Sequence, residues 1–251
     1  MSIFNNVITN RLTQGYRTVE FPSDKINLPK AYRGRPVLNQ DASDEDVQKV
    51  ASLCPAGAVN PEDRTLDLGK CLFCGKCQTI KQDFIKFTRD YRMFALKRED
   101  LIIKDILKEP KMDNSKIKKI KKLFGKSVYL RYVCAGGCNA CDADVNVLNT
   151  PVYDLSRFGI KFAASPRHAD GLVVTGPITK NMELALMKTY NAIPSPKCVI
   201  AVGACAISGG LFRENEEVVG GVDKILPVDL YIPGCPPHPF TNLYAFVKFF
   251  K

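Results

Sequence analysis

The hydrophobic pattern predicts alternating strands and helices in the C-terminal half of the chain. Five short runs rich in β-branched and apolar residues predict strands, at 127–133, 159–165, 171–176, 197–205 and 229–234. Three stretches with helical spacing of apolar residues lie between or after these runs, at 140–158, 181–192 and 239–250. This alternation predicts an α/β fold with a mostly parallel sheet.

Composition and cysteine content narrow the class of protein. The chain has 251 residues, 45% hydrophobic and 25% charged, which excludes a wholly disordered or collagen-like chain. No apolar run reaches the roughly 18 residues that a membrane-spanning helix needs, and residues 1–11 have no signal-peptide pattern. We therefore expect a cytoplasmic protein, in which ten cysteines indicate metal or redox chemistry rather than disulfides.

The positive charge is concentrated in a segment that contains no cysteine. The net charge is +10, and residues 104–132 hold 10 basic against 3 acidic side chains. We interpret 104–127 as a basic linker between modules at 1–103 and 128–251. Inside it we expect a short helix with one apolar and one lysine face, which either docks on an anionic surface or packs on its own protein. No aromatic residues alternate with the lysines, so we predict no nucleic-acid partner.

The module at 1–103 carries the cysteine spacing of an iron–sulfur protein. The sequence CLFCGKC places Cys71, Cys74 and Cys77 at C-x2-C-x2-C, a spacing that holds three corners of a cubane cluster. In bacterial ferredoxins a fourth cysteine follows this run, but Lys81 stands there. Cys54, which precedes a proline, is the candidate for the remaining ligand. Residues 81–100 are expected to form a polar return strand and tail.

The ligand positions of a second ferredoxin cluster are vacant together. Counting back from Cys54, the other positions of a first run hold Asp44, Val47 and Val50. We therefore predict one [4Fe–4S] cluster, bound by Cys54, Cys71, Cys74 and Cys77. Zinc is the alternative metal, although zinc ribbons use paired C-x2-C knuckles. The sequences CPAGAV and LGKCLFCGKC resemble the ferredoxin-like subunits of membrane-bound hydrogenases, which implies a small α+β domain.

In the module at 128–251, cysteines follow the predicted strands. Cys138 and Cys141 come after the first strand, and Cys205 and Cys235 come after the fourth and fifth, each in a turn with Gly or Pro. Parallel sheets bind ligands beyond the carboxyl ends of their strands, and glycine lets the backbone approach a cluster closely. Cys198 begins a predicted strand and is interpreted as a small buried hydrophobic residue.

The motifs of this module carry a family resemblance. They resemble the small subunit of energy-converting [NiFe] hydrogenases, as in formate hydrogenlyase, and the homologous twenty-kilodalton subunit of respiratory complex I. The motifs are CNACDADV, SPRHAD, VVTGPIT, GACAISGG and DLYIPGCPPHP. The resemblance implies a flavodoxin-like parallel sheet and a second [4Fe–4S] cluster bound by Cys138, Cys141, Cys205 and Cys235. Complex I subunits have two adjacent cysteines where this chain has C-x2-C, which favours the hydrogenase branch.

The resemblance also implies a function. The chain would be a non-catalytic electron-transfer subunit of an oxidoreductase complex, peripheral on the cytoplasmic face of a membrane. Electrons from a donor such as ferredoxin or a formate dehydrogenase module would pass through both clusters to a catalytic large subunit, of the hydrogenase type or of the homologous complex I type. Proton reduction or hydrogen oxidation would occur there. The alternatives are a related subunit that feeds a quinone or sulfur-reducing site, and a basic zinc-binding interaction protein.

Four further residues are candidates for the surroundings of the second cluster. Cys134 lies four residues before Cys138, and we predict at most a supporting role for it. Asp142 follows the C-x2-C pair and either caps a helix or belongs to a proton path. Arg167 and His168 are expected near the cluster face, where they position a partner subunit or tune the cluster potential.

Overall fold

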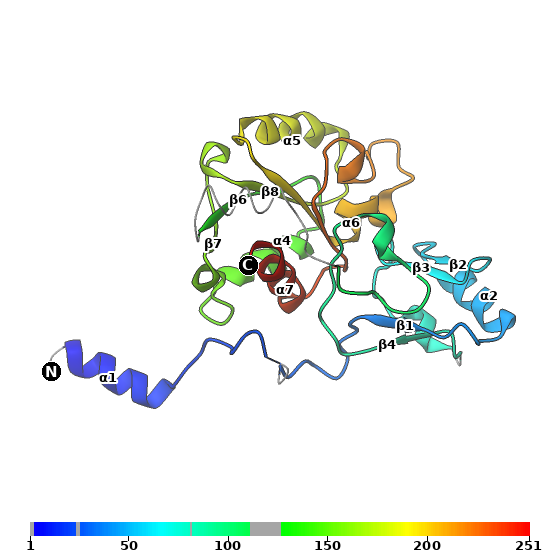
Figure 1. Cartoon of the computed structure of the whole chain (residues 1–251), viewed down its shortest axis with the longest axis horizontal. Coiled ribbons are helices and arrows are strands. Elements are labelled where there is room, and N and C mark those ends of the chain that lie inside the picture. The colour runs from blue at the N-terminus through cyan, green and yellow to red at the C-terminus, as the bar shows by residue number, and fades with distance from the viewer. Residues whose placement is uncertain (1–2, 24–25, 81, 111–126) are drawn as a thin grey trace.

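A five-stranded parallel sheet forms the C-terminal part of the chain (Figure 1). The computed structural model describes residues 3–23, 26–80, 82–110 and 127–251. The strands run in the order β10-β9-β8-β6-β7, and every neighbouring pair is parallel. Numbered along the chain this is the 2-1-3-4-5 order of flavodoxin-like folds, so the predicted fold class is confirmed. The strands are β6 (Val128–Cys134), β7 (Ile160–Phe162), β8 (Gly171–Thr175), β9 (Cys198–Val202) and β10 (Leu230–Ile232).

Helices cover both faces of this sheet. Because side chains alternate along a strand, Leu172 and Val174 of β8 point to one face and Val173 points to the other. The first face packs against α5 (Lys180–Ala192) and α6 (Gly203–Ser208), and the second against α4 (Ala140–Asn146) and α7 (Pro239–Phe250). All five residues of β8 and of β9 are buried, as expected for strands covered on both sides.

The helix predicted at 140–158 is broken in the structure. The α-helix α4 ends at Asn146, and short 3-10 turns cover Val147–Asn149 and Leu155–Phe158. Pro151 explains the break, because proline has no N–H to donate and disfavours helical backbone at the preceding Thr150. The backbone of Thr150 is extended, with ψ of 156°.

The N-terminal part is a small α+β unit with two antiparallel sheets. Strand β1 (Pro36–Leu38) pairs with β4 (Ile85–Phe87), and the second sheet has the order β2-β3-β5. Ser43 caps the one α-helix described between these strands, α2 (Asp44–Leu53), and accepts a hydrogen bond from the Asp46 N–H at 3.2 Å. The remaining strands are β2 (Val59–Asn60), β3 (Thr65–Asp67) and β5 (Ile102–Ile103).

The positions that would hold the ligands of a second ferredoxin cluster lie on α2. Val47 and Val50 are buried, at 1% and 0% exposure, and belong to the hydrophobic core of this part. Asp44 lies in the first turn of α2 and pairs with Arg64 at the surface. Two of these positions are thus packing positions of a helix that ends directly before Cys54.

Residues 91–95 join the two parts of the molecule, which corrects the expectation of a polar tail. Ala95 and Tyr231 of β10 exchange backbone hydrogen bonds of 2.9 and 2.8 Å, so residue 95 extends the edge of the parallel sheet. Tyr91 and Phe94 are buried against Tyr244 of α7. The sequence YRMFA contains the aromatic side chains that make this contact. The contact itself could not be predicted from local sequence, because its partner Tyr244 lies far away in the chain.

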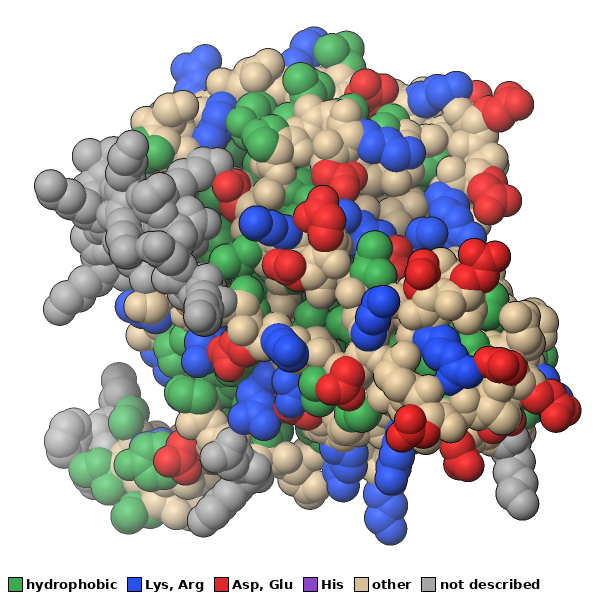
Figure 2. Space-filling model, turned by 45° about the vertical axis from the view of Figure 1, so that its right-hand side comes forward, with side chains coloured by type: hydrophobic (Ala, Val, Ile, Leu, Met, Phe, Trp, Pro, Cys, Tyr) green, Lys and Arg blue, Asp and Glu red, His purple; other side chains and the backbone are tan. Residues whose placement is uncertain are grey.

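An N-terminal helix lies outside this core. The helix α1 (Ile3–Gln14) projects away from the rest of the molecule in Figure 1 and exposes apolar side chains, including Leu12 at 79%. Most of the predicted linker helix falls on residues 111–126, which are outside the described residues. Within the described ranges, no helix combines the length and apolarity required to cross a membrane. On the face shown in Figure 2, Lys and Arg side chains are interspersed with Asp and Glu.

Candidate functional site

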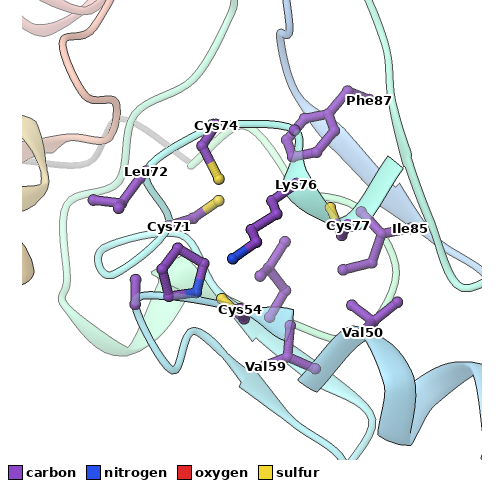
Figure 3. Close-up of a pocket in the computed structure, with 14 residues that line it drawn as sticks. Val50, Cys54, Val59, Cys71, Leu72, Cys74, Lys76, Cys77, Ile85 and Phe87 are labelled. Atoms are coloured by element: carbon purple, nitrogen blue, oxygen red, sulfur yellow. The ribbon is translucent and has the colours of Figure 1, made fainter. Parts of the chain in front are cut away.

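The four cysteines predicted to bind the first cluster line one cavity (Figure 3). We call these residues, Cys54, Cys71, Cys74 and Cys77, the first thiol site. The wall of the cavity is otherwise mostly apolar, with Val50, Val59 and Phe87 among the side chains drawn in the figure. Four thiols around a shared apolar cavity form a donor set of the kind that holds an iron–sulfur cluster.

Local backbone geometry turns the three consecutive cysteines toward this cavity. Gly75 has φ of 73° and Phe73 has φ of 50°, so the chain turns sharply between Cys71 and Cys77. Arg33 stabilises the turn, because its Nε donates to the Phe73 carbonyl at 2.6 Å. A Cβ on Gly75 would lie 2.8 Å from the Arg33 side chain, which explains why glycine is needed there.

Backbone N–H groups point at two of the sulfur atoms. The Ala58 N–H donates to Cys54 Sγ and the Phe73 N–H donates to Cys71 Sγ, both at 3.4 Å. Such bonds stabilise a thiolate and tune the potential of a cluster that it binds. Burial acts in the opposite direction. It raises the pKa of Cys77 to about 11 and raises the pKa of Cys71 further. A bound cation or cluster would remove this penalty.

The second thiol site is built at the carboxyl ends of the parallel strands. It consists of Cys138, Cys141, Cys205 and Cys235. Cys138 and Cys141 follow β6, Cys205 lies in α6 directly after β9, and Cys235 follows β10. Burial raises the pKa of Cys141 to about 12 and that of Cys205 to about 11, and the charges of the neighbouring thiols of the site add to both shifts. The structure thus brings together the residues predicted from the motifs.

Glycines let the backbone approach two of these sulfur atoms. A Cβ on Gly203, which has φ of +89°, would lie 2.6 Å from Cys141 Sγ. A Cβ on Gly210, which has φ of +58°, would lie 2.7 Å from Cys205 Sγ. A side chain at either position would therefore both strain the backbone and displace a predicted ligand.

The two thiol sites lie close together. Burial raises the pKa of Cys235, and the thiol groups of Cys138 in its own site and Cys74 in the first site add to the shift. The supporting loops are also joined, because Ser208 of α6 donates a hydrogen bond to the Gly69 carbonyl at 2.9 Å. Cys74 and Cys235 are exposed members of their sites. The thiols of Cys74 and Cys235 are thus near enough for their charges to interact across the boundary between the sites.

Asp142 does not cap α4, which corrects one of the two predicted roles. The residue before this helix is Asn139, whose side chain makes no capping bond. Asp142 is 8% exposed and accepts a hydrogen bond of 2.6 Å from Thr175 Oγ1 at the end of β8. The Tyr132 hydroxyl and Thr175 Oγ1 lie 2.7 Å apart and continue the chain. This buried network links α4 to the sheet. In the sequence, the only indication of it is Thr175, the single polar residue at the end of the apolar run VVTG.

The other predicted supporting residues lie in different places. Cys134 is the last residue of β6, with its Sγ 3.6 Å from the position of a Cβ on Gly137. Arg167 and His168 line a separate cavity with Ser127 and Asp170, which precede β6 and β8. They therefore lie at the amino ends of the strands, whereas the second thiol site lies at the carboxyl ends. Cys198 is buried in β9 at 1% exposure, as predicted.

We also searched the described residues for side chains positioned to bind a single metal ion. Across the described ranges, no three His, Cys, Asp or Glu side chains are spaced to hold a metal ion. The thiols instead line the walls of their sites, as Figure 3 shows for the first one.

Comparison with known proteins identifies the family. Residues 138–249 match the sequence model of the family described as NADH ubiquinone oxidoreductase, 20 Kd subunit. The probable membrane-bound hydrogenase subunit mbhJ of Pyrococcus furiosus is 42% identical over 139 residues, which are 55% of this chain and 83% of that protein. The chain belongs to this family.

Other relatives are similar over a comparable length. Formate hydrogenlyase subunit 7 of Escherichia coli is 47% identical over 135 residues, 54% of this chain, and the chain spans only 51% of that protein. Among solved structures, a chain of an archaeal membrane-bound sulfane sulfur reductase is 33% identical with a TM-score of 0.46, covering 53% of this chain and 73% of that one. The family match and the sequence relatives confirm the predicted resemblance to hydrogenase and complex I subunits.

Proposed function

We propose that this protein is an electron-transfer subunit that relays electrons through two [4Fe–4S] clusters. Members of its family are subunits of hydrogenase and NADH–quinone oxidoreductase complexes. The observation that carries the proposal is the grouping of eight thiols into two sets of four, joined by the approach of Cys74 to Cys235. Two adjacent sites with complete sets of soft ligands suit a relay, because soft thiolate ligands favour iron–sulfur clusters.

Each set of thiols has the chemistry to hold one cluster. Residues 1–103 supply Cys54, Cys71, Cys74 and Cys77, and residues 128–251 supply Cys138, Cys141, Cys205 and Cys235. A bound [4Fe–4S] cluster supplies a one-electron couple whose potential depends on burial and on hydrogen bonds to the sulfurs. The chain contributes the ligands, the N–H groups at Cys54 and Cys71, and the apolar walls that exclude water.

Partner subunits complete the proposed complex. The electrons enter from a donor such as ferredoxin or a formate dehydrogenase module and leave toward a catalytic large subunit, of the hydrogenase type or of the homologous complex I type. A nickel–iron centre in that large subunit would reduce protons or oxidise hydrogen. We place the chain on the cytoplasmic face of a membrane, held there by partner subunits. No catalytic residue is proposed in this chain.

Iron analysis of the full chain tests the relay. The chain is purified without oxygen and assayed for iron, acid-labile sulfide and zinc. We expect a brown protein with about eight iron per chain, four per cluster, that bleaches when dithionite is added. A colourless protein that contains zinc and no acid-labile sulfide would instead support the zinc-binding alternative and end the relay proposal.

The terminal acceptor needs a separate experiment. The family description favours a second candidate, in which the same relay feeds a quinone site, and a sulfur-reducing site is a related possibility. Co-purification of the large subunit, followed by nickel analysis, separates these cases. Nickel in the partner supports the hydrogenase, and a nickel-free partner that binds quinone or reduces sulfur supports the other candidate.

A further inference from the structure

Arg213 lies between the two thiol sites. Its Nη1 donates to the Gly210 carbonyl at 3.3 Å, and Gly210 is the glycine that approaches Cys205 Sγ. Its Nη2 lies 3.3 Å from the position of a Cβ on Gly57. Gly57 belongs to the turn after Cys54, because its N–H donates to the Cys54 carbonyl at 3.1 Å. One guanidinium therefore hydrogen-bonds to a turn of the second site and lies beside a turn of the first.

The chain is shaped to hold Arg213 in this place. A Cβ on Gly209, which has φ of +81°, would lie 2.8 Å from both Cα and Cβ of Arg213. Because neither glycine has a side chain, Arg213 can pack against Gly209 and the Cys205 thiol can pack against Gly210. The guanidinium is mostly buried, at 26% side-chain exposure. Its neighbour Glu214, at 3.6 Å, is 87% exposed, so solvent screens that carboxylate and leaves the positive charge largely in place.

We propose that Arg213 is a positioning residue that fixes the spacing of the two thiol sites and raises the reduction potentials of the clusters bound there. The proposal rests on the proposed function. Reduction adds one electron, and thus one negative charge, to a cluster. A guanidinium held nearby in a partly desolvated position stabilises that reduced form, and arginine keeps its charge at any physiological pH. Because Arg213 lies beside a turn of each site, its charge acts on both clusters.

Redox titration of the full chain tests this role. The wild-type protein and Arg213→Gln are purified without oxygen, and each cluster signal is followed by EPR as dithionite is added stepwise. Glutamine keeps a hydrogen-bond donor but removes the charge. We expect the equilibrium constant for reduction of at least one cluster to fall about tenfold, which is a potential lower by about 59 mV for one electron. Equal potentials in the two proteins would overturn the proposal.

Three further variants separate charge from packing. Arg213→Lys keeps the charge, and we expect its potentials to stay near those of the wild type. Arg213→Met removes the charge but keeps an unbranched side chain packed on Gly209. If the glutamine variant loses iron, the potentials of Arg213→Met are compared with those of the wild type instead. Arg167→Gln makes the same charge change at the opposite end of the sheet and serves as the matched control. A shift as large in Arg167→Gln, or in Arg213→Lys, would overturn the proposal.

Failure of this inference is distinct from failure of the proposed function. A wild-type chain without iron or sulfide refutes the relay, and the proposal for Arg213 with it. A wild-type chain with about eight iron whose potentials do not respond to Arg213→Gln or Arg213→Met refutes only the role of Arg213.

Discussion

Gly203→Ala tests whether the second thiol site binds a cluster. The added methyl group would lie 2.6 Å from Cys141 Sγ, at a position where φ is +89°. The backbone strain costs about 1–3 kcal/mol and the overpacking about 1–3 kcal/mol, so we expect the free energy of unfolding to fall by about 2–6 kcal/mol. The larger consequence is chemical, because the displaced thiol is a predicted ligand. We expect the iron content to fall from about eight to about four per chain.

Gly171→Ala is the matched control for this variant. Its methyl group would lie 2.6 Å from the sulfur of Cys198, the same distance, but Cys198 is not a predicted ligand. The φ of Gly171 is not in the left-handed region, so only the overpacking cost of about 1–3 kcal/mol applies. We expect this variant to be destabilised and yet to keep about eight iron.

Guanidinium unfolding followed by circular dichroism gives the stability, and iron and sulfide analysis gives the loading. The reasoning is refuted if Gly203→Ala keeps its full iron content, or if Gly171→Ala loses iron to the same extent. The first result would mean that Cys141 is not a ligand. The second would mean that any disturbance of the parallel sheet releases the clusters.

Three other predictions follow from the same structure. Cys138→Ser should keep about four iron, whereas Cys198→Ser should keep about eight, and equal loading of the two variants would contradict the assignment of ligands. Asp142→Ala should lower the free energy of unfolding by about 1–3 kcal/mol, because Thr175 loses its buried acceptor; an unchanged denaturation midpoint would contradict this. His238 caps α7 through Nδ1, which accepts from the Phe240 N–H at 3.2 Å, and burial lowers its pKa. A lowered pKa means that protonation disfavours the folded state, so stability should fall as the pH drops below about 6.5. His238→Asn keeps a capping side chain without titrating and should lose less stability between pH 7 and pH 5; parallel pH profiles would refute the role of His238.

The sequence was sufficient for features that depend on local pattern. The five predicted strands and the helices predicted at 181–192 and 239–250 are present, but the strand predicted at 197–205 ends at Val202, where the unpredicted helix α6 begins. The grouping of the cysteines also follows, because the carboxyl ends of parallel strands meet at one edge of a sheet. The break after Asn146 was missed, although Pro151 signals it, because the apolar spacing continues on both sides.

Contacts between segments that are distant in the sequence could not be predicted from the local sequence pattern. His168 and Arg167 occur beside a predicted strand in the sequence, but they precede β8, so they lie at the edge opposite the cysteines. Asp142 looks like a helix cap by its position, and only the fold shows that Thr175 is near enough to bind it. Arg213 gave no signal in the sequence, since its two neighbours, Gly57 and Gly210, lie in different parts of the chain.

The packing between the two parts suggests why their thiol sites are encoded in one chain. Strand β10 carries Cys235 at its end, and its edge pairs with Ala95, while Phe21 stacks on Phe240 with ring centroids 6.2 Å apart. The position of the second thiol site is thus set partly by residues of the N-terminal part. Two subunits that merely dock could change the spacing of their sites, whereas here each of the two hydrophobic core clusters contains residues from both parts of the chain. Under the proposed relay, loosening the Ala95 pairing should therefore slow electron transfer from one thiol site to the other without releasing iron from either.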